Sequence, residues 1–310
     1  MNQKSLCMCI SRINLFSLAP PLIKEREEEV ELCRKRKIPY FVVPIDIFGN
    51  KGTVPKIEIC SQIPAGLGFL PRPVESLAGY DVLCRGYFST REGTLDLIPK
   101  MGGVNVIGID EMNLTENWPN FVFPEFTKRK VGTVRVSDLA KYIPNYSLDG
   151  KIFVKEKVKG QLGHGGVIDL KQALQIPQIG VPYTGGFFAS EGEVEYAEVS
   201  PDSEVILSEP VNFKGDEKKN LEYRCWIANN QFVAASRYAY PQDQNIPSEV
   251  SDITHDFVKA HIGRLPPYYV ADFGITSDRG VVLVELNDFM CAGNTSKEIF
   301  GKILDAYLAA

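Results

Sequence analysis

The strongest constraint on this chain is a pair of strand-forming runs near its C-terminus, residues 270–287. The first run carries Asp272, a turn follows at 277–280, and the apolar second run ends in Glu285-Leu-Asn287. Side chains two apart on a strand share a face, and Asp272 can reach that face if the runs pair. Carboxylate and amide oxygens suit Mg²⁺ and leave positions for phosphate and water. The pattern predicts a hairpin that holds magnesium; a merely polar strand end is the alternative.

Composition places the chain among ordinary globular proteins. Its 310 residues are 44% hydrophobic and 24% charged, and they suffice for roughly two or three subdomains. A formal net charge of −5 argues against a nucleic-acid partner bound through a broad basic surface. No apolar run approaches the ~18 residues of a membrane helix, and Arg12 and Asn14 interrupt the N-terminal apolar stretch. We therefore expect neither a membrane partner nor a signal peptide.

The seven cysteines are scattered along the chain. They form no Cys-x-x-Cys pair and have no histidine at zinc spacing. Reduced structural thiols in a cytoplasmic protein are the expected state.

The first region, residues 1–122, alternates strand and helix signals, which indicates a small α/β domain. It contains no Gly-x-Gly-x-x-Gly turn, so it has no mark of a dinucleotide site. Its expected elements are strands at 6–13, 38–44, 81–85 and 105–109, a charged helix from Pro21 to Arg36, and a loop at 64–73.

The second region, from 123 to 207, combines a lysine-ended strand, 151–155, with a glycine-rich loop, 160–166. Glycine lets backbone N–H groups approach phosphate oxygens closely, and this loop leads into a strand instead of the helix of a P-loop. It predicts either a flap over phosphates or a plain surface hairpin. The residues concerned are Lys155, Lys159, Gly163, Gly165 and Gly166, between a short helix at 139–143 capped by Ser137-Asp138 and a strand at 167–170.

The third region, from 208 to 310, begins where an apolar strand, 204–207, runs into Ser208-Glu209-Pro210-Val211. Helices are expected at 252–265 and 297–308. Between these elements lies an alternating pattern at 221–238, which predicts a hairpin that is described next.

The hairpin at 221–238 turns at Asn229-Asn230, because asparagine tolerates positive φ. Arg224 and Arg237 lie on its two strands, roughly opposite each other. Two such arginines can form a fork for anionic oxygens. A solvent-facing Arg224 that pairs with Glu222 is the alternative.

Taken in order, these elements resemble the ATP-grasp superfamily, over about residues 125–308, and in particular a less-characterised bacterial and viral subgroup. The resemblance rests on a strand-ending lysine, a glycine loop, a Glu-Pro hinge, an arginine hairpin and a final Asp…Glu-x-Asn set. It implies an α/β (α+β) architecture in which two α+β subdomains, at about 123–207 and 208–310, clasp ATP after an α/β pre-domain, 1–122. The chain departs from the usual pattern at Glu156, where Lys-Pro is common, and after Asn287, where the peptide ligases have a proline turn.

The resemblance also implies roles for individual residues. Lys155 and Lys159 would meet the inner phosphates of ATP, and the glycine loop would close over them. The hinge residues Ser208, Glu209 and Val211 would face adenine and ribose. Mg²⁺, for which Mn²⁺ could substitute, would be held by Asp272, Glu285 and Asn287, and Arg224 and Arg237 would hold the transferred phosphoryl group.

Family chemistry activates a carboxylate as an acyl-phosphate that an amine, or less often a thiol, attacks. The implied function is an ATP-dependent carboxylate–amine ligase that acts on an amino acid, a peptide or a small metabolite and releases ADP and phosphate. A phosphotransferase and a nucleotide-binding module without turnover are the alternatives. The sequence identifies neither the substrates nor the oligomeric state. His164 and Arg85 could be substrate contacts or plain surface residues, and Lys128 and Lys130 could join the nucleotide site.

Overall fold

A computed structural model describes residues 6–12, 20–38, 40–44, 79–85, 103, 105–108, 112–157, 165–183, 195–216, 219–238, 245–289 and 296–309. The chain divides into two compact units. The first unit comprises 1–113, 223–271 and 286–310, and the second comprises 114–222 and 272–285. The predicted limits at 122 and 207 stay a prediction. Among the described residues, no helix has the length and apolar character that crossing a bilayer requires.

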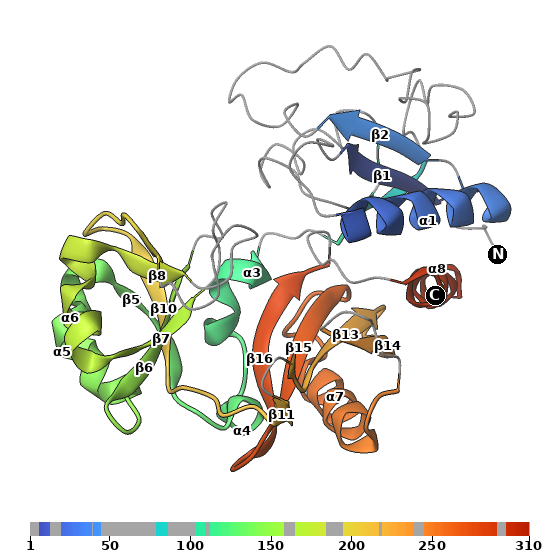
Figure 1. Ribbon diagram of the computed structural model, residues 1–310. Helices are drawn as coiled ribbons and strands as arrows, with labels where there is room; N and C mark the ends of the chain where they lie inside the picture. The colour runs from blue at the N-terminus through green and yellow to red at the C-terminus, as the bar shows by residue number, and fades with distance from the viewer. Residues whose placement is uncertain are drawn as a thin grey trace. The chain divides into compact units, whose positions relative to one another are not determined.

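The N-terminal part of the first unit is a parallel sheet with strand order β2-β1-β3-β4 (Figure 1). Helix α1, Pro20–Arg36, connects the parallel strands β1 and β2, so these three elements form a βαβ unit. The predicted α/β layer is confirmed, with a shorter last strand than expected. The strands are β1 Leu6–Arg12, β2 Tyr40–Pro44, β3 Asp81–Arg85 and β4 Val106–Ile107.

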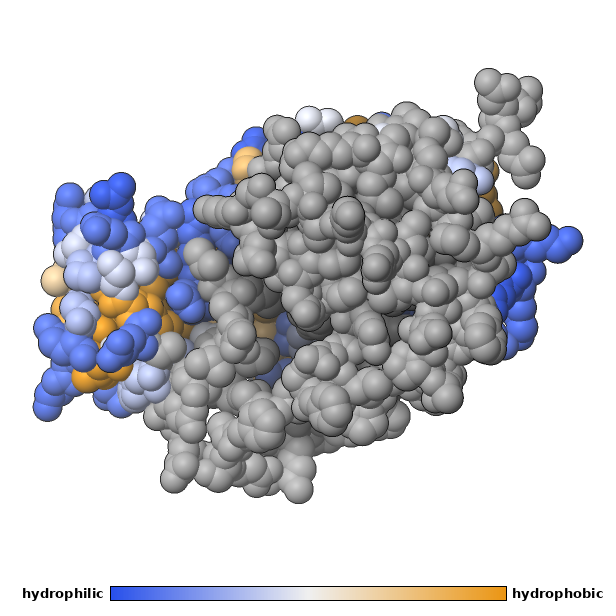
Figure 2. Space-filling view, turned by 90° about the horizontal axis from the view of Figure 1, so that it is seen from above, coloured by the Kyte–Doolittle hydropathy of each residue, from blue (hydrophilic) through white to orange (hydrophobic). Residues whose placement is uncertain are grey.

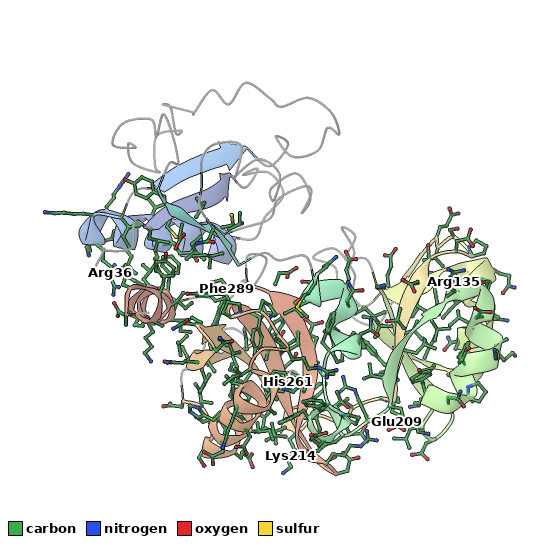
Figure 3. All side chains as sticks on the ribbon, turned by 180° about the vertical axis from the view of Figure 1, so that it is seen from behind. Arg36, Arg135, Glu209, Lys214, His261 and Phe289 are labelled. Carbon is green, nitrogen blue, oxygen red and sulfur yellow. The ribbon has the colours of Figure 1, made fainter. Side chains whose placement is uncertain are left out.

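Helix α8, Lys297–Leu308, has the bounds that the sequence predicted, because Ser296 caps it by accepting a 3.3 Å hydrogen bond from the Ile299 N–H. Its buried side chains share one core cluster with Trp226 and Phe289. Those two rings meet edge to face with centroids 5.2 Å apart, and Figure 3 labels Phe289. Helix α8 also contacts α1, where Arg36 pairs with Asp305 at 2.5 Å.

The second unit is built on an antiparallel sheet with strand order β5-β10-β6-β7. Helices α5 and α6 lie together on one face of this sheet, as Figure 1 shows, and close an apolar core cluster over it. Apolar residues also reach the surface of this unit (Figure 2), among them Val167 and Leu174. The elements are β5 Val131–Arg135, β6 Lys151–Glu156, β7 Gly166–Asp169, β10 Glu204–Ser208, α5 Leu139–Tyr146 and α6 Leu170–Ile179.

Two expectations in this unit are wrong. The strand expected at 167–170 stops at Asp169, which caps the unpredicted helix α6 through a capping box with Gln172, at 2.7 and 3.2 Å. Ser137 and Asp138 do not cap α5 through a side-chain hydrogen bond, because they already lie in a 3₁₀ turn, η3 Val136–Asp138.

A second four-stranded sheet has the order β14-β13-β15-β16. Both predicted hairpins are confirmed, and Asn229 and Asn230 have φ of 52° and 56° as expected. The boundary between the two units passes through both β15 and β16. Helix α7 starts and ends four residues earlier than predicted. The bounds are β13 Glu222–Ala228, β14 Gln231–Arg237, β15 Tyr269–Thr276, β16 Gly280–Asp288 and α7 Ser248–His261.

The remaining described elements are short. They are α3 Leu114–Asn117, η2 Trp118–Asn120, α4 Pro124–Thr127, β8 Val181–Tyr183, β9 Glu195–Ala197, β11 Gly215–Asp216 and β12 Lys219–Asn220. The reduced state expected of the cysteines is confirmed for Cys33, Cys84 and Cys225, which are buried free thiols. The loop expected at 64–73 lies outside the described residues.

The ring of Phe213 packs directly on strand β15 within the second unit. Phe213 forms a bridge with Thr276, and its ring occupies the space that a side chain on Gly274 would fill. Glycine at 274 therefore allows a close approach that any other residue would block.

Gly274→Ala is expected to destabilise the second unit, because the added methyl group would overlap the Phe213 ring. We expect the free energy of unfolding to fall by about 1–3 kcal/mol in a denaturant titration. Gly301→Ala on α8 is the matched control, since its methyl group would meet its nearest neighbour, Arg36, at an ordinary 3.4 Å and alanine favours a helix. Unchanged stability of Gly274→Ala would contradict this packing.

Candidate functional site

Two predicted site residues meet in the second unit. Lys155 lies near the end of β6, Glu285 lies on β16, and the Lys155 ammonium donates to Glu285 Oε2 at 2.5 Å. The two side chains are only 9% and 18% exposed, so this pair is poorly screened by water. The structure thus brings the predicted phosphate-binding lysine onto a predicted metal ligand.

The glycine loop returns to the chain beside Lys155. A side chain on Gly165 would lie 2.5 Å from the Val154 carbonyl and 2.7 Å from the Lys155 Cβ. Only glycine fits this position, and Gly166, which follows, pairs with Val154. Lys159, Gly163 and His164 lie outside the described residues, as does the side chain of Arg85.

The other predicted metal ligands are buried oxygen donors. Asp272 on β15 is fully buried and Asn287 on β16 is 2% exposed. Alternation along β16 places Glu285 and Asn287 on the same face of that strand. Within the described ranges no three His, Cys, Asp or Glu side chains gather as a metal cluster; the predicted set has two carboxylates and an amide. Such hard oxygen donors fit Mg²⁺.

The hinge after β10 is held by polar contacts. The buried Ser208 hydroxyl donates to the Glu209 carbonyl at 2.9 Å, and the Glu209 N–H donates to the Lys130 carbonyl at 3.1 Å. The Glu209 carboxylate, labelled in Figure 3, accepts from Arg279 Nη1 at 3.2 Å. Val211 is half-buried. In this structure the predicted adenine-side acid is therefore paired with an arginine from the β15–β16 turn.

Arg129 is the principal residue of this region that the sequence analysis missed. Its guanidinium donates to the Leu283 carbonyl at 2.5 Å and the Val284 carbonyl at 2.9 Å, immediately before Glu285. It also reaches the Ser208 hydroxyl at 3.4 Å. Burial, followed by the nearby charge of Arg279, lowers the pKa of Arg129 to about 10, which still leaves it protonated at pH 7.

Lys128 and Arg279 are joined next to Arg129. The Lys128 ammonium donates to the Arg279 carbonyl at 3.3 Å, and Arg279 Nη1 donates to the Lys128 carbonyl at the same distance. Lys128 adopts a left-handed backbone with φ of 48°, at the end of α4. These reciprocal contacts tie the 128–130 segment to the β15–β16 turn.

The fork predicted for Arg224 and Arg237 is wrong. Arg224 pairs with Ser236 and Arg237 with Tyr223, so the two arginines point to opposite faces of the hairpin. The cause is a bulge between Trp226 and Ile227, since one extra residue reverses the facing of everything beyond it. The solvent-facing alternative for Arg224 is also wrong.

Arg224 is buried instead of solvent-facing, with 4% of its surface exposed. Its guanidinium lies 4.5 Å from the centre of the Tyr238 ring, a cation–π contact. The proposed catalytic roles of Arg224 and Arg237 stay predictions, now as separate side chains.

Comparison with known proteins identifies the family. Residues 127–309 match a family described as an ATP-grasp domain, the third family of its clade, and the chain belongs to this ATP-grasp family. No curated protein matches the sequence.

Solved structures that resemble this one are ATP-grasp proteins, and the predicted α+β ATP-grasp fold is confirmed. They include a RimK domain protein from Sphaerobacter thermophilus, with a TM-score of 0.56, 12% identity, and coverage of 97% of this chain and 98% of that one. The ATP-grasp ligase PsnB gives 0.55, 14%, and 99% of each chain. D-alanine–D-alanine ligase from Bacillus anthracis gives 0.51, 11%, 99% and 98%. At these identities the likeness concerns the fold.

Glu156→Gln is expected to stabilise the protein at neutral pH. Burial raises the pKa of Glu156 above its ordinary 4.5. A carboxyl with a raised folded-state pKa contributes stability below its unfolded pKa and loses it as the pH rises through the folded pKa. The variant should therefore match wild type below about pH 4.5 and unfold at higher denaturant near pH 7. The same stability difference at both pH values would contradict a buried, desolvated Glu156.

Proposed function

We propose that this protein is an ATP-dependent ligase that joins a carboxylate to an amine, or less often a thiol, through an acyl-phosphate. The observation that supports this best is the shielded ion pair between Lys155 and Glu285 at 2.5 Å. A cation suited to phosphate and an acid suited to magnesium share one place, where a Mg·ATP complex would find partners for both of its charges.

In this proposal the residues act through charge and position. Lys155 and Lys159 bind the inner phosphates as point charges, and the loop 160–166 excludes water. Ser208, Glu209 and Val211 contact adenine and ribose. Asp272, Glu285 and Asn287 would hold Mg²⁺, which neutralises phosphate charge when bound. Arg224 and Arg237 stabilise the negative charge that develops during phosphoryl transfer.

Solved structures with this fold support nucleotide, metal and a small or peptidic substrate. PsnB was solved with Mg, ADP and a variant of its minimal precursor, and also with a precursor peptide and AMPPNP. The Bacillus anthracis ligase was solved with ATP. We extend these ligand classes to the present chain and propose an amino acid, peptide or small metabolite as its substrate.

Lys155→Met should strengthen Mn²⁺ binding in the absence of nucleotide, because Lys155 and a divalent cation compete for Glu285. An increase of about fivefold, on the order of 1 kcal/mol, is expected by calorimetry, while ADP binding weakens. Lys157→Met is the matched control, since it removes the same charge from a lysine that pairs with Glu204. Weaker Mn²⁺ binding in Lys155→Met would reject the competition.

The acyl-phosphate gives the test of the reaction. Amino acids and peptides are incubated with Mg·ATP and hydroxylamine, and a true carboxylate substrate should yield a hydroxamate and ADP. Asp272→Ala and Glu285→Ala should each cost at least about 2–4 kcal/mol of transition-state stabilisation. Their circular dichroism should stay that of wild type.

Each alternative reaction has a distinct product. AMP with pyrophosphate would indicate adenylation, and ADP with a phosphorylated product inert to hydroxylamine would indicate a phosphotransferase. ATP binding without any product across the screen would favour a nucleotide-binding module. Any of these three results would reject the ligase proposal.

A further inference from the structure

Arg129 connects two strand ends of the second unit that are far apart in the sequence. Its four acceptors are the carbonyls of Thr127, Leu283 and Val284 and the hydroxyl of Ser208. Leu283 lies 154 residues further along the chain, and Ser208 lies 79 residues further. One side chain thus links the end of β10 to the middle of β16.

Such a buried cation needs a compensating arrangement. Taking a guanidinium out of water costs several kcal/mol, and the cost is offset only when its N–H groups find acceptors. Strand β16 is the last strand of its sheet, so its outer edge presents backbone carbonyls that require donors. Arg129 supplies donors to two consecutive carbonyls, and the planar fan of guanidinium N–H groups suits this better than a lysine ammonium.

The acceptors of Arg129 adjoin predicted site residues. Val284 immediately precedes Glu285, and Ser208 immediately precedes Glu209. Consecutive Cα atoms lie about 3.8 Å apart, so fixing these neighbours also fixes where the two acids start. The charges of Glu209 and Glu285 in turn favour the protonated Arg129.

We propose that Arg129 is a positioning residue that holds Glu285 and Glu209 in a fixed relation for magnesium and nucleotide, an inference that rests on the proposed function. Arg129 touches neither ligand. It acts through the backbone of β16 on the metal side and through Ser208 on the adenine side, so its loss misplaces both acids together.

The test compares ADP affinity, measured by calorimetry with and without Mn²⁺, in wild type and variants. Arg129→Lys keeps the charge but loses the fan of donors, and we expect its ADP affinity in Mn²⁺ to fall at least about tenfold. Ile143→Ala is the control, because Ile143 is a buried core residue of α5 and its truncation lowers stability without approaching these strands. We expect Ile143→Ala to bind ADP and Mn²⁺ like wild type.

Ser208→Ala provides a second, milder variant that removes the Ser208 contact and leaves both β16 contacts of Arg129 intact. ADP affinity should fall while the gain that Mn²⁺ adds stays as in wild type. This variant decides the question if Arg129→Lys does not fold. Wild-type affinities in folded Arg129→Lys, or in Ser208→Ala, would overturn the proposal, as would equal losses in Ile143→Ala. Absence of ADP binding by wild type would instead contradict the proposed function.

Discussion

The arrangement of the second unit depends on balancing charge that is buried beside strand β16. Lys155, Arg129 and Arg279 face Glu285 and Glu209 at hydrogen-bonding distances or as near charges. Charges removed from water are tolerated only when paired, so each of these side chains constrains the others. The paired charges come from β6, β16, the end of β10 and the segment before β5. Such a set suits a ligand that carries both phosphates and a metal ion, because ligand charges can exchange with charges already in place.

Apolar packing determines where these charges can stand. The sheet β5-β10-β6-β7, covered by α5 and α6, fixes Lys155 near the end of β6. Gly165 then returns the chain so close to β6 that no side chain fits. On the other strand pair, Gly274 leaves room for the Phe213 ring. These close approaches make the backbone rigid where precise placement of charge matters, and rigid elements hold functional groups better than loops.

Local signals made much of the fold predictable from sequence, whereas long-range pairing did not. The hairpin with Asp272 and Glu285 follows from alternation and a turn, which are local. Helix α6 has a local signal too, the capping box that Asp169 begins, although Pro177 inside the helix obscures it. The role of Arg129 has no local signal, because its acceptors on β16 lie more than 150 residues away. The opposite facing of Arg224 and Arg237 depends on a bulge that alternation alone does not reveal.

A crystal structure of the protein with ADP and Mn²⁺ tests the central claim most directly, because anomalous scattering locates manganese independently of interpretation. We predict an anomalous peak against the carboxylates of Asp272 and Glu285, with the Lys155 ammonium moved from Glu285 to a phosphate oxygen. A bound nucleotide with Lys155 still paired to Glu285, or manganese bound away from both carboxylates, would contradict it.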